Sequence, residues 1–160
     1  MPLDEKTFRR VLSCFPTGVT VMTSARADGS LVGVTVSAFA PVSLNPPLVL
    51  FCLDKRTASL ETFLDGFFGV NVLAQDQSQV SNMFARRNEE KWQGISRRDS
   101  EYGVPLIDGC VAHLECQVHD VLEGGDHKVI IGHVLRLDLF QEKHPLLYFR
   151  SAYYALGNNL

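Results

Sequence analysis

The sequence lacks several features that define major classes of protein. It contains no apolar run near the ~18 residues that a membrane-spanning helix needs, and its first residues, MPLDEKTFRRVL, carry acids instead of an apolar signal segment. Its basic residues form no stripe and its formal net charge is −3, which argues against a nucleic-acid partner. These absences predict a cytoplasmic protein that binds neither membranes nor nucleic acids.

Cysteine pairs, metal motifs and nucleophile motifs are also lacking. The sequence has four cysteines, namely Cys14, Cys52, Cys110 and Cys116. They show no C-x-x-C spacing, and their apolar neighbours favour buried free thiols in a reducing compartment. The histidines form no metal-binding motif, and a hairpin turn at Gly124-Gly125 would spread them along two strands, so no metal site is predicted. No G-x-S-x-G motif or Ser/His/Asp set stands out.

The residues that are present suffice for one domain, which we place at 1–160. Of the 160 residues, 46% are hydrophobic and 21% are charged, which is the balance of a globular protein. A chain of this size buries roughly 70% of its unfolded surface, so a full core is expected. No internal repeat and no linker divides the chain.

Alternating apolar and polar residues predict a mainly β fold. Strands are expected in the segments 18–24, 30–44, 48–53, 67–74, 112–119, 127–140 and 145–156. Hairpin turns are expected at Asp28-Gly29 and in the sequence EGGD. The segment 48–53 is apolar throughout, so we expect it to be buried on both faces.

Three short helices are predicted beside these strands. Apolar residues at helical spacing after Asp4 indicate an amphipathic helix, and they are Phe8, Val11, Leu12 and Phe15. The segments 57–66, closed by Gly66, and 76–87 indicate two more. Strands and helices do not alternate regularly, which favours an antiparallel barrel flanked by helices over a doubly wound sheet.

One strand face carries only small residues. In VGVTVSAF, residues 32–39, this face consists of Gly33, Thr35 and Ser37. Such a face lets a flat ligand approach the backbone closely and offers it short polar groups. The same residues are also ordinary on the solvated face of an edge strand, and this stretch alone leaves both interpretations open.

Two further segments could carry chemistry. The sequence LDKRTAS, residues 53–59, opens a predicted helix and brings Lys55 and Ser59 to its N-terminus, which would suit a phosphate or simply an N-cap with solvated cations. His127 follows the GGD turn. It could stack on a planar ligand, or it could be a turn histidine without a functional role. The segment from Arg87 to Asp108 has little periodicity and is typical of a lid, a binding loop or a mobile loop.

Taken in order, several segments resemble the flavin reductase family of FMN-binding split barrels. The segments that carry the resemblance are FRRVLSCFPTGVTVMTS, VGVTVSAFAPVSLNPPLVLFCL, FGVNVLAQDQ, FARR, GGDHKVIIGHV and PLLYFRSAY. They cover Phe8 to about Tyr153. Within the family, the chain is most similar to the small reductase components that supply reduced flavin to separate flavin-dependent monooxygenases.

The resemblance implies a fold and a set of site residues. The fold is an antiparallel split β-barrel, Greek-key-like, with a few short flanking helices, assembled as a homodimer. The residues that would line the flavin ring are Thr35, Val36, Ser37, Ala38, Cys52, Leu53 and Asp54. Those that would hold the ribityl phosphate are Lys55, Ser59, Phe84, Ala85 and Arg86. His127 would lie at the nicotinamide as the catalytic, orienting residue, and Tyr148 and Arg150 would help to form the NAD(P)H pocket.

The activity implied is NAD(P)H:flavin oxidoreduction. Hydride would pass from NADH or NADPH to FMN or FAD, and the reduced flavin would leave for a separate monooxygenase. Two alternatives stay open: a split-barrel flavoprotein that uses tightly bound flavin to reduce another acceptor, and a flavin-binding barrel without enzymatic activity.

Overall fold

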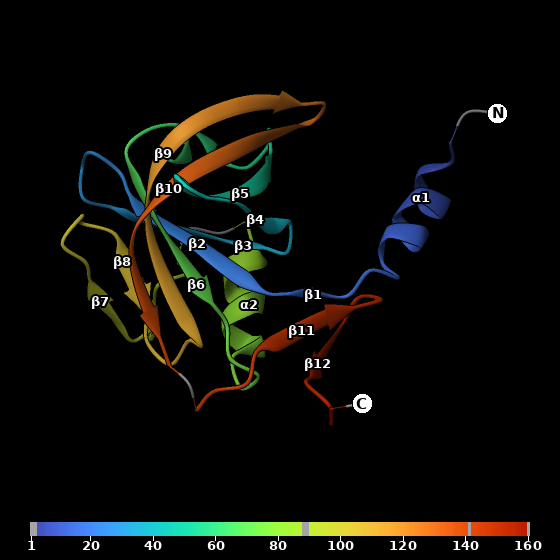
Figure 1. The fold of residues 1–160 in the computed structure, drawn as a ribbon. Helices are drawn as coiled ribbons and strands as arrows, with labels where there is room; N and C mark the ends of the chain where they lie inside the picture. The colour runs from blue at the N-terminus through green and yellow to red at the C-terminus, as the bar shows by residue number, and fades with distance from the viewer. Residues whose placement is uncertain (1–2, 88–89, 141, 160) are drawn as a thin grey trace.

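Antiparallel strands dominate the computed structural model, which describes residues 3–87, 90–140 and 142–159 (Figure 1). The largest sheet has the spatial order β3 (Leu31–Val36), β2 (Thr20–Ala25), β6 (Phe67–Val72), β9 (Ala112–Gly124), β10 (His127–Leu139), β5 (Pro47–Asp54) and β4 (Phe39–Leu44). All neighbouring strands in it run antiparallel. The mainly β, antiparallel fold predicted from the sequence is confirmed.

The largest sheet is open. Its edge strands β3 and β4 are not paired with each other in the described part of the chain. The chain nevertheless passes directly from one edge to the other, because β3 ends at Val36 and β4 begins at Phe39. The expected barrel is therefore split, and we call the gap between β3 and β4 the seam.

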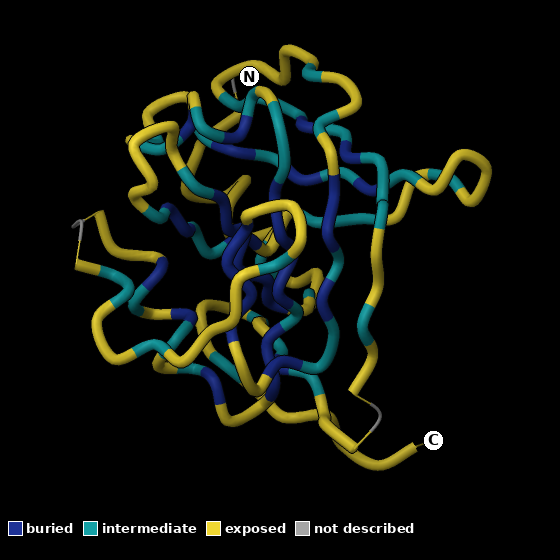
Figure 2. The backbone as a smooth tube through the Cα atoms, turned by 90° about the vertical axis from the view of Figure 1, so that its left-hand side faces the viewer, coloured by how far each residue is buried: buried dark blue, intermediate teal, exposed yellow. Residues whose placement is uncertain are grey.

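Two apolar clusters lie on opposite faces of this sheet. The inner one is built around Phe51, whose ring centroid lies 6.0 Å from that of Phe63 and 5.0 Å from that of Phe68. The other lies beneath helix α2 (Ser78–Ala85). Val21 belongs to the second cluster and Met22 to the first, as expected for successive residues of a strand. Figure 2 shows the buried segments gathered in the interior and the exposed turns around them.

The opening helix is confirmed as α1 (Glu5–Leu12). It begins after Asp4, whose carboxylate accepts a hydrogen bond from the Thr7 backbone N–H at 2.9 Å. None of its residues is buried in this chain, and Figure 1 shows it projecting away from the sheet. Cys14 follows this helix and is exposed, so the expectation of a buried thiol is wrong there.

The second predicted helix is shorter than expected. Segment 57–66 forms only a 3₁₀-helix, η1 (Leu60–Phe63). Its two apolar residues, Leu60 and Phe63, are both buried, and their spacing of three suits a single 3₁₀ turn. Gly66 lies beyond it with φ of 76°, in the left-handed region. Helix α2 falls within the predicted segment 76–87.

The prediction that the 48–53 segment is buried on both faces is wrong. In β5, Val49, Phe51 and Leu53 are buried, whereas the residues between them, such as Leu50 and Cys52, are only half-buried. The strand therefore presents one apolar face that its own chain does not cover.

The β9–β10 hairpin has a different register from the predicted one. His127 pairs with Gly124, so the turn residues are Gly125 and Asp126, one position later than expected. Register shifts at Ile131/Gly132 and Val134/Arg136 mark irregularities within the ladder. A shift of this kind cannot be read from alternation alone.

Part of the irregular segment 87–108 forms a short hairpin. Its strands are β7 (Arg97–Asp99) and β8 (Pro105–Ile107). The side-chain carbonyl of Asn71 accepts the Ile107 N–H at 2.7 Å, and the Thr23 hydroxyl donates to the Pro105 carbonyl at 2.5 Å. The β7–β8 hairpin is therefore fixed to the sheet. Residues 88–89 of the same segment lie outside the described residues.

A small sheet stands beside the seam. It consists of β1 (Thr17–Gly18), β11 (Leu146–Phe149) and β12 (Ala152–Ala155) in the order β1-β11-β12. Arg150 and Ser151 form the turn between β11 and β12 with φ of 47° and 65°, which is the left-handed region that non-glycine residues rarely adopt. None of the described helices is both long and apolar enough to cross a membrane.

Candidate functional site

A pocket of about 500 Å³, which we call the seam pocket, lies where the small sheet meets the seam. It brings together five of the residues assigned by resemblance, namely Ser37, Ala38, Cys52, Tyr148 and Arg150. The first three come from the seam and from β5, and the last two come from the end of β11 and the turn that follows it. Residues that were separated by about a hundred positions in the sequence therefore share one cavity.

The walls of the seam pocket are small or apolar. Ser37 and Ala38 lie in the connection between β3 and β4, and Cys52 lies on the uncovered face of β5. Burial raises the pKa of the Cys52 thiol, so it stays protonated and serves as a small wall residue. Leu12 and Phe15 also line the pocket, although the sequence did not single them out for it.

Arg150 is held by a local network at the rim of the seam pocket. Its backbone N–H donates to the Ser13 carbonyl at 3.1 Å, and its guanidinium lies 5.0 Å from the centre of the Phe149 ring. Positive φ in a non-glycine residue costs free energy and persists where surrounding contacts enforce it. The β11–β12 turn thus fixes Arg150 beside Tyr148.

A second pocket of about 250 Å³, which we call the cationic pocket, lies between the end of β5 and the end of α2. Its basic lining residues are Arg26, Arg56, Arg86, Arg87 and Lys91. Five residues assigned by resemblance also line it, namely Asp54, Ser59, Phe84, Ala85 and Arg86.

One of the cations in this pocket is neutralised within the chain. Arg56 donates to both carboxylate oxygens of Asp54, with Nη2···Oδ2 at 2.6 Å. These hydrogen bonds hold the pKa of Asp54 far below its usual range, so the carboxylate stays charged. The remaining positive charge favours an anionic ligand.

The small-residue face of β3 has a structural role that the sequence did not reveal. A Cβ on Gly33 would lie 2.5 Å from the Phe84 ring, and the Thr35 hydroxyl donates to the Ser81 carbonyl at 2.6 Å. Helix α2 therefore covers this face at both residues. Only Ser37, which lies beyond the end of β3, is exposed and lines the seam pocket.

Three other assigned side chains are buried in the apolar clusters. Val36 and Leu53 are 5% and 2% exposed, and Phe84 is 0% exposed. Phe84 lines the cationic pocket, Val36 and Leu53 line neither pocket, and none of the three offers a polar side-chain group to a ligand. They can approach a ligand only through their backbone or through the small part of their surface that faces the cavity.

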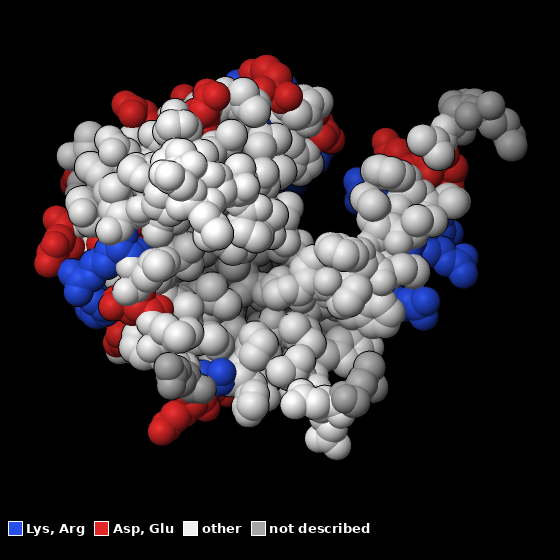
Figure 3. Space-filling model, in the orientation of Figure 1, with Lys and Arg blue, Asp and Glu red and all other residues white. Residues whose placement is uncertain are grey.

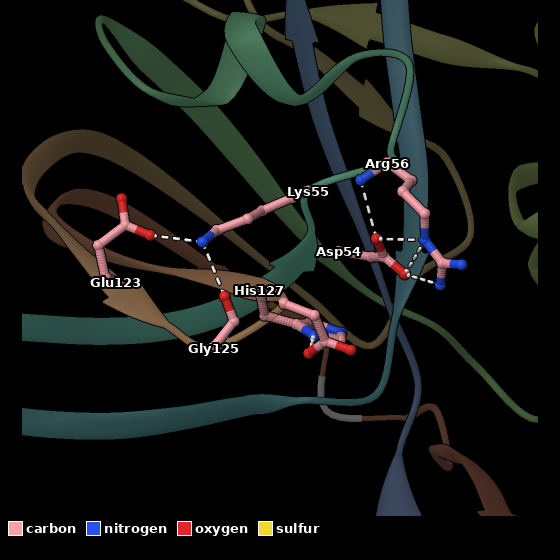
Figure 4. Close-up of polar contacts among 7 residues, drawn as sticks. Asp54, Lys55, Arg56, Glu123, Gly125 and His127 are labelled. Atoms are coloured by element: carbon pink, nitrogen blue, oxygen red, sulfur yellow. Dashed lines mark hydrogen bonds and ion pairs between the residues drawn. The ribbon is translucent and has the colours of Figure 1, made fainter.

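Lys55 follows β5 and contacts the β9–β10 turn, and His127 lies where that turn enters β10 (Figure 4). The Lys55 ammonium donates to the Gly125 carbonyl and pairs with Glu123, both at 2.7 Å. Lys128 and Lys55 together lower the pKa of Glu123 to about 2. In this structure the Lys55 ammonium is engaged at the turn and does not line the cationic pocket, so its expected contact with a phosphate stays a prediction.

His127 begins β10 opposite Asp54 of β5, and its side chain is 42% exposed. Its Nδ1 lies 2.7 Å from Oδ1 of Asp126. This contact orients the ring and leaves Nε2 for another partner. His127 lines neither the seam pocket nor the cationic pocket.

Two buried polar atoms fit a site built for a flat, phosphorylated ligand. Oγ1 of Thr17 and Nε1 of Trp92 have no hydrogen-bond partner among the described residues, and these residues line the seam pocket and the cationic pocket, respectively. Buried polar groups are usually paired, so such atoms indicate places for a ligand or water. A flavin, with a planar ring and a phosphate chain, matches an apolar pocket accompanied by a cationic one.

Comparison with known proteins identifies the class. Residues 12–157 match the family described as "Flavin reductase like domain", and the chain belongs to that family. It is 41% identical over 152 residues to a flavin reductase of Pseudomonas putida, covering 94% of this chain and 89% of that protein. It is also 41% identical to the reductase subunit of a flavin-dependent monooxygenase of Rhodococcus jostii, covering 94% and 77%.

Solved structures give the same result. The nitrilotriacetate monooxygenase component B homologue of Mycobacterium thermoresistibile superposes with a TM-score of 0.92 at 44% identity, covering 96% of this chain and 87% of that one. The NADH:FAD oxidoreductase of Streptomyces globisporus in complex with NAD and FAD fragments superposes with a TM-score of 0.93 at 34% identity, covering 98% and 95%. The split-barrel resemblance seen in the sequence is confirmed.

Proposed function

We propose that this protein is an NAD(P)H:flavin oxidoreductase that reduces FMN or FAD and supplies the reduced flavin to a separate monooxygenase. The observation that carries the proposal is the seam pocket, which unites three residues assigned to the flavin ring, Ser37, Ala38 and Cys52, with two assigned to the NAD(P)H pocket, Tyr148 and Arg150. The names of the relatives from Pseudomonas putida and Rhodococcus jostii support it.

The reaction requires this chain to bind and orient the two cofactors rather than to supply acid–base chemistry. When bound, the flavin accepts a hydride from the reduced nicotinamide, and the difficult chemistry belongs to the two cofactors. Ser37, Ala38 and Cys52 line the seam pocket with small side chains, and Tyr148 and Arg150 line the same cavity. Holding two rings in contact in this way converts an encounter into an intramolecular step.

The cationic pocket supplies the second half of the binding site. Arg86 and Ser59 line it from α2 and from the segment before η1, as the resemblance implied for the phosphate. Charge-assisted hydrogen bonds to a phosphate are stronger than neutral ones. We therefore assign the flavin ring to the seam pocket and the phosphate end to the cationic pocket.

The protein is further proposed to act as a homodimer. Phe8 and Val11 of α1 are 51% and 63% exposed, and the uncovered face of β5 is apolar. Figure 3 shows the surface between the sheet and α1 almost without charged side chains, which gather at its rim. An exposed apolar helix face joined to an apolar pocket wall is best covered by a second copy related by a two-fold axis.

A cytoplasmic location belongs to the same proposal. All four cysteines are free thiols, although Cys14 and Cys52 are near enough to solvent to be oxidised. Unpaired thiols of this kind are typical of a reducing compartment.

One assay tests the proposed activity. Loss of NADH absorbance is followed in the presence of FMN, of FAD or of neither. We expect turnover that requires added flavin and releases reduced flavin, detected as oxygen consumption or by reduction of cytochrome c. No NADH oxidation with either flavin would contradict the proposal. Turnover with a flavin that remains bound through gel filtration would favour a flavoprotein that serves another acceptor.

A further inference from the structure

Tyr153 of β12 connects the small sheet to helix α2, although it lines neither pocket (Figure 1). Its hydroxyl lies 2.8 Å from Oγ of Ser81 and donates to Oδ1 of Asn82 at 3.0 Å. A tyrosine hydroxyl has one hydrogen to donate, so the Ser81 hydroxyl is the donor in the first contact. The Tyr153 hydroxyl therefore both donates to α2 and accepts from it.

Helix α2 is in turn fixed to the large sheet. Ser81 is fully buried, and its backbone carbonyl accepts the Thr35 hydroxyl of β3 at 2.6 Å. Phe84, three residues further along α2, packs against Gly33 of the same strand. Ser81 thus makes two contacts, one to β3 through its carbonyl and one to β12 through its hydroxyl. It joins the large sheet to the small one.

The ring of Tyr153 lies next to a residue that does line the seam pocket. Tyr153 pairs directly with Tyr148 across β11 and β12, and their ring centroids are 5.4 Å apart with an angle of 56° between the ring planes. Contacts of this kind between aromatic rings are favourable and depend on geometry. Tyr148 is 37% exposed, so the protein confines only part of its surface. The anchored ring of Tyr153 is therefore a support for the Tyr148 ring.

We propose that Tyr153 is a positioning residue, which holds the Tyr148 ring in place in the seam pocket relative to the large sheet. The contacts run from Thr35 through Ser81 and Tyr153 to Tyr148. Ser37, which lines the same pocket, directly follows the strand of Thr35. The proposal deepens the proposed function and rests on it for the ligand, a reduced nicotinamide nucleotide. Because hydride transfer needs two rings in a defined contact, a Tyr148 ring that moves would slow the reaction.

A purely structural role is the alternative explanation. Tyr153 also packs against the apolar cluster beneath α2, and its hydrogen bonds would stabilise the protein whatever its ligand. Such a role predicts that Tyr153→Phe lowers the melting temperature without a selective effect on NADH. The experiment therefore compares NADH with the flavin and tests whether Tyr153 acts through Tyr148.

The first measurement is the steady-state kinetics of the whole chain, together with a flavin titration. In Tyr153→Phe we expect kcat/KM for NADH to fall about 3- to 10-fold, with the dissociation constant of the flavin changed less than about 2-fold. Ser81→Ala removes the same hydrogen bond from the side of α2 and should have the same effect. Tyr154→Phe is the matched control, because this neighbouring tyrosine is 49% exposed, and it should change neither quantity. Unchanged kcat/KM in Tyr153→Phe and Ser81→Ala, or an equal loss of flavin affinity, would overturn the proposal.

A double-mutant cycle tests the path through Tyr148. Tyr148→Ala should itself lower kcat/KM for NADH. Adding Tyr153→Phe to this variant should lower it by less than about 2-fold further, because no ring is left for Tyr153 to hold. A merely structural contribution of Tyr153 would instead multiply with that of Tyr148, and reductions that multiply would contradict the proposal.

A spectroscopic measurement separates this proposal from the proposed function. The four tyrosines are replaced by a ring-fluorinated tyrosine, and the fluorine resonance of Tyr148 is identified by its loss in Tyr148→Phe. Ser81→Ala should shift this resonance toward that of a solvated tyrosine, whether or not the protein oxidises NADH. The shift without NADH oxidation would overturn the reductase function alone, and normal turnover with an unmoved resonance would overturn the positioning role alone. If Tyr153→Phe does not fold, the kinetics of Ser81→Ala decide the outcome.

Discussion

At the scale of single residues, Gly33 shows how a small residue on a strand can serve the packing of the protein's own side chains. The missing Cβ makes room for the Phe84 ring, which is itself 0% exposed. The sequence correctly suggested that something approaches this backbone closely. A side chain of α2 makes this close approach, and Gly33 also lines the cationic pocket.

Gly33→Ala should therefore destabilise the protein. The added methyl group would lie 2.5 Å from two atoms of the Phe84 ring, and overpacking of this kind costs about 1–3 kcal/mol. Chemical denaturation in urea measures the loss. Gly18→Ala is the matched control, because nothing lies within 4 Å of a Cβ at Gly18, and it should change stability by less than about 0.5 kcal/mol. Equal stability of both variants would show that Phe84 adapts freely.

His127 provides the second prediction at this scale. Its ring is oriented by Asp126 and exposed at the start of β10, which suits a group that orients the nicotinamide. His127→Ala should lower kcat/KM for NADH by a factor that corresponds to about 1–3 kcal/mol, while the dissociation constant of the flavin changes little. Steady-state kinetics with each substrate varied, together with a flavin titration, measures both. Wild-type kinetics in the variant would remove His127 from the site.

At the scale of elements, alternation in the sequence located the strands well because period-2 patterns follow directly from strand geometry. Exposure was less predictable. The residues of β5 are apolar on both faces, but one face, including Leu50 and Cys52, lines the seam pocket. Apolar composition alone cannot distinguish a face buried in the core from one reserved for a ligand or a second copy.

Turns and cavities explain most of what the sequence left undetermined. The β9–β10 register depends on bulges and on which residue pairs across the turn, and neither leaves a periodic signal. Lys55 follows β5, so its position near a helix start suggested a phosphate, yet the fold brings the Gly125 carbonyl within its reach. Lys91, which lines the cationic pocket, lies 36 positions later along the chain than Lys55. It belongs to an irregular segment, where no local pattern predicts its position.

The β9–β10 turn gives a prediction for an element. Lys55→Met should free the turn that carries His127 and raise KM for NADH several-fold, with flavin affinity unchanged, because the ammonium holds the Gly125 carbonyl. Lys128→Met is the matched control, since Lys128 pairs with Glu123 without contacting Gly125, and it should have a smaller effect. Selective loss of FMN affinity in Lys55→Met, with riboflavin affinity kept, would instead show that Lys55 binds the phosphate.

At the scale of the whole molecule, we expect α1 to contribute the surface through which the proposed dimer forms. Phe8→Glu combined with Val11→Glu should convert a dimer into monomers, because charges would replace the apolar face that a second copy covers. Light scattering at micromolar concentration measures the mass. Lys6→Glu lies on the opposite face of the helix and should leave the dimer intact. A wild-type mass equal to that of one chain would contradict the proposed dimer.

The position of α1 also links catalysis to mass action. Leu12 at its end and Phe15 just beyond it line the seam pocket, so the wall of that pocket is continuous with the apolar face that we propose a second copy covers. Association would then stabilise the pocket as well as the fold, and the free energy of both would depend on protein concentration. Specific activity should consequently be constant in concentrated solution and decline on dilution, with a lag when dilute enzyme is concentrated again. In a cell, the total activity of such a reductase would fall more steeply than the concentration of its chain. Halving the number of chains would more than halve the number of complete pockets.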